Sequence, residues 1–266
     1  YFMKLDHSNY HTLKNRYLTN SRIGDWLRCK RFFYELHISG ERPSKAMTDA
    51  LRIGKAVDTL VFFGKDEFLK NFIAVSRRSF KNPPKDIIEL TESQYSDVLG
   101  MAEVINRQPA MLDCANHEKQ KIISLDMPIG EHFLGLSAIP DVIDIKDGVC
   151  TLSDLKTAWE ADEHKYHWKC MTLGYYRQFA VMTIILRKTN PEIKEFVYRH
   201  VGCEKDKDGI FNPFAFKLDN ERIELFVEDI LDNIIPAITA EKDFKPKEVS
   251  WADAVVIGSL NKDDEF

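Results

Sequence analysis

Two aspartates and a lysine in the middle of the chain are the residues best suited to chemistry. Asp141 follows Pro140, and Asp154 lies 13 residues further on, two residues before Lys156. Both aspartates occur in stretches that are otherwise largely apolar, where an unpaired charge is costly. Two carboxylates and one ammonium leave a negative site, for which a divalent cation is the natural partner. The pattern therefore predicts a metal site.

The elements that must position these residues are two strands. Alternating segments flank Lys146-Asp147-Gly148, and Asp-Gly between two such segments is a strong signal for a tight hairpin turn. We therefore predict a β-hairpin over residues 134–156. Alternation puts one set of first-strand residues on a common face, namely Phe133, Ile139, Asp141, Ile143 and Ile145. The matching set on the second strand is Cys150, Leu152, Asp154 and Lys156.

Pro140-Asp141 followed by Asp154-Leu155-Lys156 resembles the signature of the PD-(D/E)XK nuclease superfamily. The gap between the two aspartates is a usual hairpin length in that superfamily. The resemblance implies an α/β fold with a restriction-endonuclease-like core, in which helices flank a mixed central β-sheet. The core would cover about residues 20–203 of a single nuclease domain spanning 1–266. Residues 204–266 would add a C-terminal strand, a helix and a tail.

The segment from Ser21 to Tyr34 resembles the opening helix of RecB-like nucleases. Asn20 and Ser21 are expected to cap this helix. Some of these relatives use the cysteine at the position of Cys29, with three more near the C-terminus, to hold an iron–sulfur cluster. The last cysteine here is Cys203, so we expect no iron–sulfur cluster and interpret Cys29 as a small buried residue.

A second helix is predicted over residues 46–63, where Asp58 follows Gly54 by four positions. This stretch resembles the G-x-x-x-H helix of the RecB and RecE-type families, in which a histidine or an acid lines the metal site. The resemblance implies that Asp58 is a metal ligand in place of the histidine. An aspartate on the polar edge of an amphipathic helix is the alternative interpretation, and the sequence supports both equally.

One long helix is predicted from about residue 162, and Gln178 lies on it. In RecB-like and RecE-type nucleases a helix at this place carries a Q-x-x-x-Y motif that supports the catalytic lysine and contacts substrate. The resemblance gives Gln178 that role and gives Tyr175 and Arg177 contacts with substrate. The position of the motif tyrosine is occupied by Met182, so that role is unfilled or shifted to Tyr175. Without the resemblance, Gln178 reads as a helix-surface residue.

The oxygen ligands in this set suit Mg²⁺ or Mn²⁺ rather than zinc, because these cations prefer hard oxygen donors. Asp141, Asp154 and the Leu155 carbonyl are the expected ligands, with Asp58 completing one site. Lys156 would orient or deprotonate the attacking water, or offset charge that develops on the phosphate.

The remaining elements follow from caps and alternation. A capping box at Thr91 and Gln94 predicts a helix to about Gln108. Three strands and one further helix are expected at 119–127, 195–203, 211–218 and 220–238.

Composition limits the function classes. The chain has 266 residues, 44% of them hydrophobic, which suffices for one sizeable core. No apolar run of about 18 residues is present, so no membrane span is expected. A formal net charge of −5 argues against a broad basic surface that coats DNA. Five widely spaced cysteines without a C-x-x-C pair fit a reducing, cytoplasmic location.

Within the superfamily, the sequence most resembles the phage-recombination exonucleases, which are RecE-type (exodeoxyribonuclease VIII-like) and related to lambda exonuclease. The resemblance implies a Mg²⁺-dependent exonuclease that degrades one strand of double-stranded DNA in the 5′→3′ direction. It also implies a single-strand annealing protein as partner and assembly as a homo-oligomer.

Two alternatives remain open. The first is an inactive DNA-binding or assembly module with the same fold, which the departures at Asp58 and Met182 favour. The second is an unrelated α/β interaction domain in which Asp154 and Lys156 form an ordinary ion pair on a strand edge.

Overall fold

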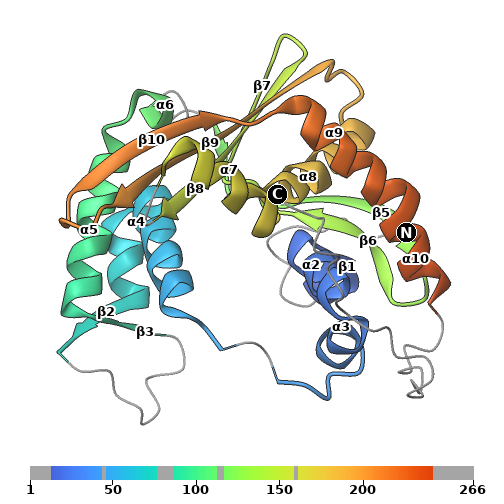
Figure 1. Ribbon diagram of the computed structural model, residues 1–266, viewed down its shortest axis with the longest axis horizontal. Helices are drawn as coiled ribbons and strands as arrows, with labels where there is room; N and C mark the ends of the chain where they lie inside the picture. The colour runs from blue at the N-terminus through green and yellow to red at the C-terminus, as the bar shows by residue number, and fades with distance from the viewer. Residues whose placement is uncertain (1–12, 44–45, 77–86, 113–116, 159–160, 242–266) are drawn as a thin grey trace, which may run out of the picture.

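The computed structural model describes residues 13–43, 46–76, 87–112, 117–158 and 161–241. A mixed five-stranded sheet spans the molecule, and helices cover both of its faces (Figure 1). Strand β8 lies at its centre, antiparallel to β7 and parallel to β9. In sheet order the strands are β10 (Phe211–Lys217), β9 (Glu195–Lys205), β8 (Val149–Ala158), β7 (Val142–Lys146) and β4 (Glu118–Lys119).

The predicted hairpin is present as β7 and β8. Asp147 and Gly148 form the turn with φ angles of 52° and 79°, the left-handed conformations that an Asp-Gly turn adopts. The expectation of a single first strand from Leu134 through Ile145 is wrong. Strand β6 (Phe133–Ala138) ends before Pro140 and pairs in a second sheet with β1 (Tyr17–Leu18) and β5 (Ile123–Ile129). Proline has no N–H for a ladder hydrogen bond, which fits a break at this point.

One face of the sheet is covered by α4 (Asp49–Asn71) and α5 (Glu92–Asn106). Leu155, Val201 and Cys203 point into this layer from β8 and β9. The capping box predicted at Thr91 is confirmed, with the Thr91 and Gln94 side chains each bonded to the other residue's backbone N–H. Two short parallel strands, β2 (Phe72–Val75) and β3 (Ile88–Thr91), connect the two helices.

The opposite face is covered by α7 (Glu163–Thr172) and α8 (Tyr175–Thr189). The expectation of one long helix from residue 162 is wrong, because the chain breaks at Leu173 and Gly174. Gly174 adopts φ 72°, a conformation that ends helices and favours glycine. The break gives α8 its own direction against the sheet.

Before the sheet, α2 (Asn20–Arg28) and α3 (Lys30–His37) pack against β6 and α8. The residue that caps α2 is Thr19, whose side chain accepts from the Arg22 N–H, rather than Asn20 or Ser21. Cys29 lies between the two helices and is exposed, so its interpretation as a buried residue is wrong.

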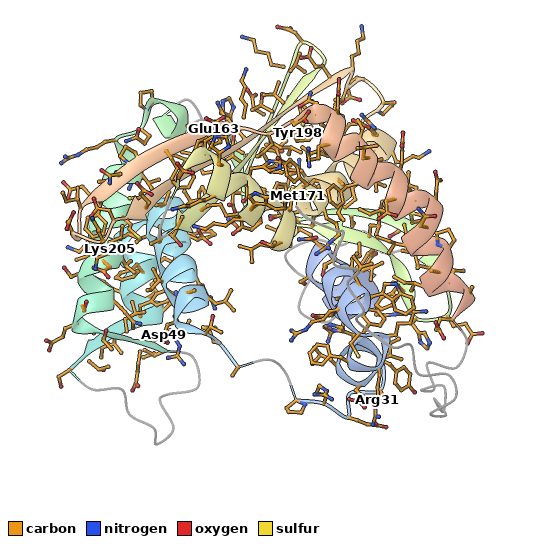
Figure 2. The ribbon with its side chains drawn as sticks, viewed as in Figure 1. Arg31, Asp49, Glu163, Met171, Tyr198 and Lys205 are labelled. Atoms are coloured by element: carbon orange, nitrogen blue, oxygen red, sulfur yellow. The ribbon has the colours of Figure 1, made fainter. Side chains whose placement is uncertain are left out.

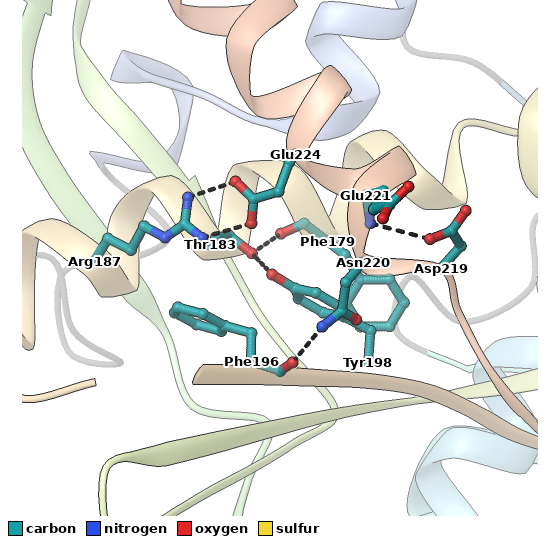
Figure 3. Close-up of polar contacts among 9 residues, drawn as sticks. All are labelled: Phe179, Thr183, Arg187, Phe196, Tyr198, Asp219, Asn220, Glu221 and Glu224. Atoms are coloured by element: carbon teal, nitrogen blue, oxygen red, sulfur yellow. Dashed lines mark hydrogen bonds and ion pairs between the residues drawn. The ribbon is translucent and has the colours of Figure 1, made fainter. Parts of the chain in front are cut away.

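After the sheet, the chain forms α9 (Asn220–Asp229), a π-helical turn (Ile230–Ile234) and α10 (Ile235–Ala240). Asp219 caps α9, and its side chain accepts from the Glu221 N–H. Figure 3 shows the polar contacts that join α9 to α8 and β9: Arg187 with Glu224, Thr183 with Tyr198, and Asn220 with the Phe196 carbonyl. The predicted tail from residue 242 lies outside the described residues. No helix in the described part of the chain is both long and apolar enough to cross a membrane.

Candidate active site

Strand β8 presents Asp154 and Lys156 on the face covered by α8, next to the buried side chains of Cys150 and Leu152. The Asp154 side chain is 3% exposed, and its Oδ2 forms an ion pair with Lys156 Nζ. The Lys156 side chain is 17% exposed and therefore still reaches solvent at one end. The predicted placement of a carboxylate and an ammonium on one strand face is thus present, and the two groups also form the ion pair that the alternative interpretation expects.

Helix α8 contributes two predicted residues to the same place. Gln178 Nε2 donates to Asp154 Oδ1 over 2.7 Å. The Tyr175 ring lies under the Lys156 ammonium, with Nζ 4.6 Å from the ring centroid, at a distance typical of a cation–π contact. The resemblance implies that Gln178 supports the lysine, whereas the structure joins Gln178 to Asp154 and Tyr175 to Lys156.

Asp141 approaches from the break between β6 and β7. Its Oδ2 accepts the Leu155 N–H over 2.6 Å, and its Oδ1 accepts from Gln120 Nε2 over 2.5 Å. The N–H and C=O groups of one residue in an extended strand point to the same edge. The Leu155 carbonyl is therefore directed to the edge where Asp141 lies, as a ligand role would require.

Asp58 lies on α4, whose contact with β8 brings it within electrostatic range of Asp154 and Lys156. Burial, followed by the negative charge of Asp154, raises the pKa of Asp58 to about 7. An aspartate on a solvated polar edge would not experience this environment. Of the two interpretations of Asp58, this electrostatic environment favours the one in which the residue faces the site.

The electrostatics of the cluster show a shortage of positive charge. Burial raises the pKa of Asp141 well above its ordinary value, and the charges of Asp154 and Asp58 raise it further. Burial alone would lower the pKa of Lys156, but the charges of Asp154 and Asp141 outweigh this effect and raise it. With all groups ionised, three carboxylates face one ammonium. A cation bound here would stabilise the ionised carboxylates.

The donor set fits a hard divalent cation, although the site is not fully arranged for one. Within the described residues, no three His, Cys, Asp or Glu side chains converge closely enough to form a complete metal site. Asp141 and Asp154 are engaged by amide groups and by Lys156, but each carboxylate oxygen has more than one lone pair. Asp154 Oδ2 is also buried without a hydrogen bond. Asp58, Asp141, Asp154 and the Leu155 carbonyl are therefore the residues that would hold Mg²⁺ or Mn²⁺.

Two residues that the sequence did not suggest lie behind Asp154. His200 on β9 is fully buried, and its Nε2 is 3.6 Å from Asp154 Oδ2. Its Nδ1 is 2.9 Å from the hydroxyl of Tyr166 on α7. Burial lowers the pKa of His200 to about 4. The only available signal for His200 was its place on the alternating face of β9 that also carries Phe196 and Tyr198. Tyr166 and Gln120 carried none.

A cavity of about 540 Å³ begins beside Gln178 and extends along the start of α2. Its wall includes the polar side chains of Asn20, Arg22 and Ser137. Arg177, predicted to contact substrate, is half-buried and donates to Asn20 Oδ1 over 2.8 Å. It therefore lies at the contact between α8 and α2 rather than with the carboxylates.

Comparisons with known proteins bear on the fold. The crystal structure of a protein from Eubacterium rectale, provisionally described as an exonuclease, matches with a TM-score of 0.63 at 17% identity. The match covers 90% of this chain and 87% of that one. The two proteins share a fold. At this identity the likeness extends to the mixed α/β architecture and no further.

The structure of SSO0001 aligns over 75% of this chain and 83% of that one at 12% identity, with a TM-score of 0.28 that is too low to support an argument. No protein-family model matches the sequence, and no curated protein does.

Proposed function

We propose that this protein is a metal-dependent nuclease that hydrolyses phosphodiester bonds in DNA. The observation that carries the proposal is the meeting of Asp141, Asp154, Lys156 and Gln178, from three separate parts of the chain, in one buried and negatively charged cluster. Similarity in fold to a protein described as an exonuclease supports the same class of reaction.

Each of these residues has a separate role in the proposed hydrolysis. Bound Mg²⁺ would polarise the scissile phosphate and lower the pKa of the attacking water. Lys156, whose pKa is raised, stays protonated and can neutralise negative charge that develops on the phosphate. Gln178 holds Asp154 Oδ1, and the Tyr175 ring holds the ammonium of Lys156. These contacts orient the groups before substrate arrives, which reduces the reorganisation needed in the transition state.

Finer features of the proposal rest on the sequence resemblance. They are 5′→3′ digestion of double-stranded DNA in phage-type recombination, an annealing protein as partner, a homo-oligomeric assembly and a cytoplasmic location. The cavity beside Gln178 offers polar groups close to the cluster.

Digestion of linear duplex DNA labelled at one 5′ end, beside a covalently closed circle, tests the proposal. We expect release of labelled mononucleotide from the linear DNA with Mg²⁺, no release with EDTA, and an intact circle. Asp154→Ala should reduce cleavage at least about 100-fold. The matched control is Asp144→Ala, which removes a partly exposed aspartate of the same hairpin that pairs with His117.

A DNA-binding or assembly module without activity is the second candidate. It is favoured by one observation, the lack of a complete three-ligand metal site within the described residues. Binding of DNA without cleavage in either Mg²⁺ or Mn²⁺ would replace the first candidate with this one. Nicking of the circle would instead indicate an endonuclease.

A further inference from the structure

A chain of three buried polar side chains runs from α7 through β9 to the candidate site. Tyr166, His200 and Asp154 are 3%, 0% and 3% exposed. The Tyr166 hydroxyl is 2.9 Å from His200 Nδ1, and His200 Nε2 is 3.6 Å from Asp154 Oδ2. The rings of Tyr175 and Phe179 pack around the imidazole and exclude solvent from it. Buried polar atoms need hydrogen-bond partners. The positions of the protons on these three side chains therefore decide which of their polar atoms are satisfied.

The surroundings determine which ring nitrogen carries the proton. Within the described residues, the one hydrogen bond of the Tyr166 hydroxyl is to His200 Nδ1, so its proton has that nitrogen as acceptor. A neutral imidazole that accepts at Nδ1 is protonated at Nε2. The Nε2–H then faces Asp154 Oδ2. The opposite arrangement would point a nitrogen lone pair at a carboxylate and leave the tyrosine proton without an acceptor.

Two donors are thus directed at one oxygen of Asp154. Lys156 Nζ holds Oδ2 in an ion pair, and the His200 Nε2–H stands just beyond hydrogen-bond distance from it. If Lys156 turns toward a phosphate, Oδ2 loses a partner in a buried place, which is costly. A small rotation of the carboxylate would bring Oδ2 to the imidazole instead.

We propose that Tyr166 and His200 are positioning residues for Asp154. Tyr166 holds His200 as the Nε2–H tautomer, and His200 provides an uncharged donor that keeps the Asp154 carboxylate oriented when Lys156 engages substrate. The inference rests on the proposed function, because it assigns a role at the same site. Neither residue touches substrate, and both act through Asp154.

The first test determines which ring nitrogen of His200 is protonated in metal-free protein. Long-range ¹H–¹⁵N NMR of protein labelled at histidine distinguishes protonated from unprotonated ring nitrogens, and comparison with His200→Gln assigns the His200 signals among the eight histidines. We expect Nε2 protonated and Nδ1 unprotonated in the wild type, and a mixture of tautomers in Tyr166→Phe. A wild-type His200 protonated at Nδ1 would overturn the proposal, whatever the result for Tyr166→Phe.

The second test measures Mn²⁺ affinity by calorimetry and DNA cleavage by steady-state kinetics. Groups that orient metal ligands typically contribute 10–100-fold to affinity or activity, so Tyr166→Phe should weaken Mn²⁺ binding by about 10-fold. It should also lower kcat without changing KM for DNA. The matched control is Tyr198→Phe, which deletes another buried hydroxyl, one on β9 that bonds Thr183 on α8 instead of His200 (Figure 3).

The two variants separate positioning from packing. Equal Mn²⁺ affinities for Tyr166→Phe and Tyr198→Phe would show that the Tyr166 hydroxyl has no specific effect on the site. That result would overturn the proposal. A wild-type protein that neither binds Mn²⁺ nor cuts DNA would overturn the proposed function instead. The tautomer measurement needs no metal, so it would still decide whether Tyr166 sets the proton of His200.

Discussion

Asp154 is the residue at which the contacts of the candidate site meet. Gln178 donates to one of its oxygens, Lys156 pairs with the other, and His200 stands behind that second oxygen. Each of these groups offers positive charge or a hydrogen to a carboxylate that is almost fully buried. Asp154 therefore has its charge stabilised from several directions before any cation arrives.

Replacement of Lys156 tests how far its positive charge stabilises the buried carboxylates. Lys156→Ala leaves the carboxylates without their ammonium, and loss of one partner of a buried pair costs about 3 kcal/mol. We expect that loss in the free energy of unfolding of metal-free protein, measured by urea denaturation in EDTA, and a fall in cleavage of about 100-fold. Addition of Mn²⁺ should recover more stability in the variant than in the wild type, because the cation replaces the missing charge.

Lys205→Ala is the matched control, since Lys205 forms a half-buried pair with Asp97 away from the site. It should lose stability without gaining a larger response to Mn²⁺. Figure 2 places Lys205 at the end of β9, beside α5. Identical Mn²⁺ responses in the two variants would contradict a charge-balancing role for Lys156.

At the scale of elements, the parallel ladder between β8 and β9 sets the position of Lys156. Residue 156 pairs with Gly202, where an added Cβ would lie 2.0 Å from the Lys156 carbonyl oxygen and 2.5 Å from the Phe214 ring. The nearer of the two neighbours is a backbone atom, so the ladder itself would have to shift. The close approach requires glycine.

Gly202→Ala should therefore reduce both stability and activity. Overpacking of this kind costs about 1–3 kcal/mol, which thermal unfolding would detect as a lower Tm. The shift of the Lys156 backbone should also lower kcat for DNA. Gly54→Ala is the comparison, because a Cβ there meets only Thr157 Oγ1 at an ordinary 3.8 Å. A Gly202→Ala protein as stable as the wild type would show that β8 and β9 can move apart at this point without a measurable cost in stability.

Local signals in the sequence predict local structure well here. The Asp147-Gly148 turn and the Thr91–Gln94 capping box depend on neighbouring residues, and both form as predicted. The break at Gly174 interrupts an otherwise helical apolar pattern and was missed. The division of the first strand at Pro140 was also missed, because sheet membership depends on distant partners.

The same contrast between local signals and distant partners applies to the residues of the candidate site. The resemblance identified the residues that the structure brings together around Asp154, including Asp58 and Gln178. His200 and Tyr166 come from elements that meet only in the folded chain and belong to no motif that the sequence displayed. Arg177 was expected near substrate, but its neighbour Asn20 lies far away in the sequence.

At the scale of the whole molecule, the site lies where two hydrophobic layers meet across the sheet. One layer contains α4 and α5, and the other contains α8 with α9. Figure 1 shows α4 and α5 on one side of an arch and α2 and α3 on the other, with the long strands above. Asp58 comes from the first layer and Gln178 from the second. Global stability and the state of the site are therefore linked.

The pH dependence of unfolding measures this link. Asp58 has an ordinary pKa of 3.8, raised in the folded protein to about 7. The folded state keeps a proton that the unfolded chain releases, so the free energy of unfolding of metal-free protein falls as pH rises from about 4 to about 7. Asp58→Asn should reduce this fall, leaving the part that the raised pKa of Asp141 contributes. The variant should be more stable than the wild type at pH 8, by on the order of 4 kcal/mol.

Urea unfolding in EDTA at several pH values gives the comparison. The lowered pKa of His200 acts in the opposite sense, destabilising the fold as pH falls from 6.5 toward about 4. It is present in both proteins and cancels in their difference. Asp144→Asn is the control on the exposed part of the hairpin. If the free energies of unfolding of Asp58→Asn and the wild type differed by the same amount at every pH, the pKa of Asp58 would not be raised by its surroundings.

The central position of β8 has a consequence for how the protein is made. β8 pairs with β9, whose residues leave the ribosome more than 40 positions later, since Cys150 pairs with Phe196. Parallel pairings of this kind close only after the intervening chain, here α7 and α8, is in place. Asp154 and Lys156 are thus translated well before Gln178 and His200 exist to hold them. A nascent chain therefore has no assembled candidate site until β9, the last of these strands to be translated, is complete.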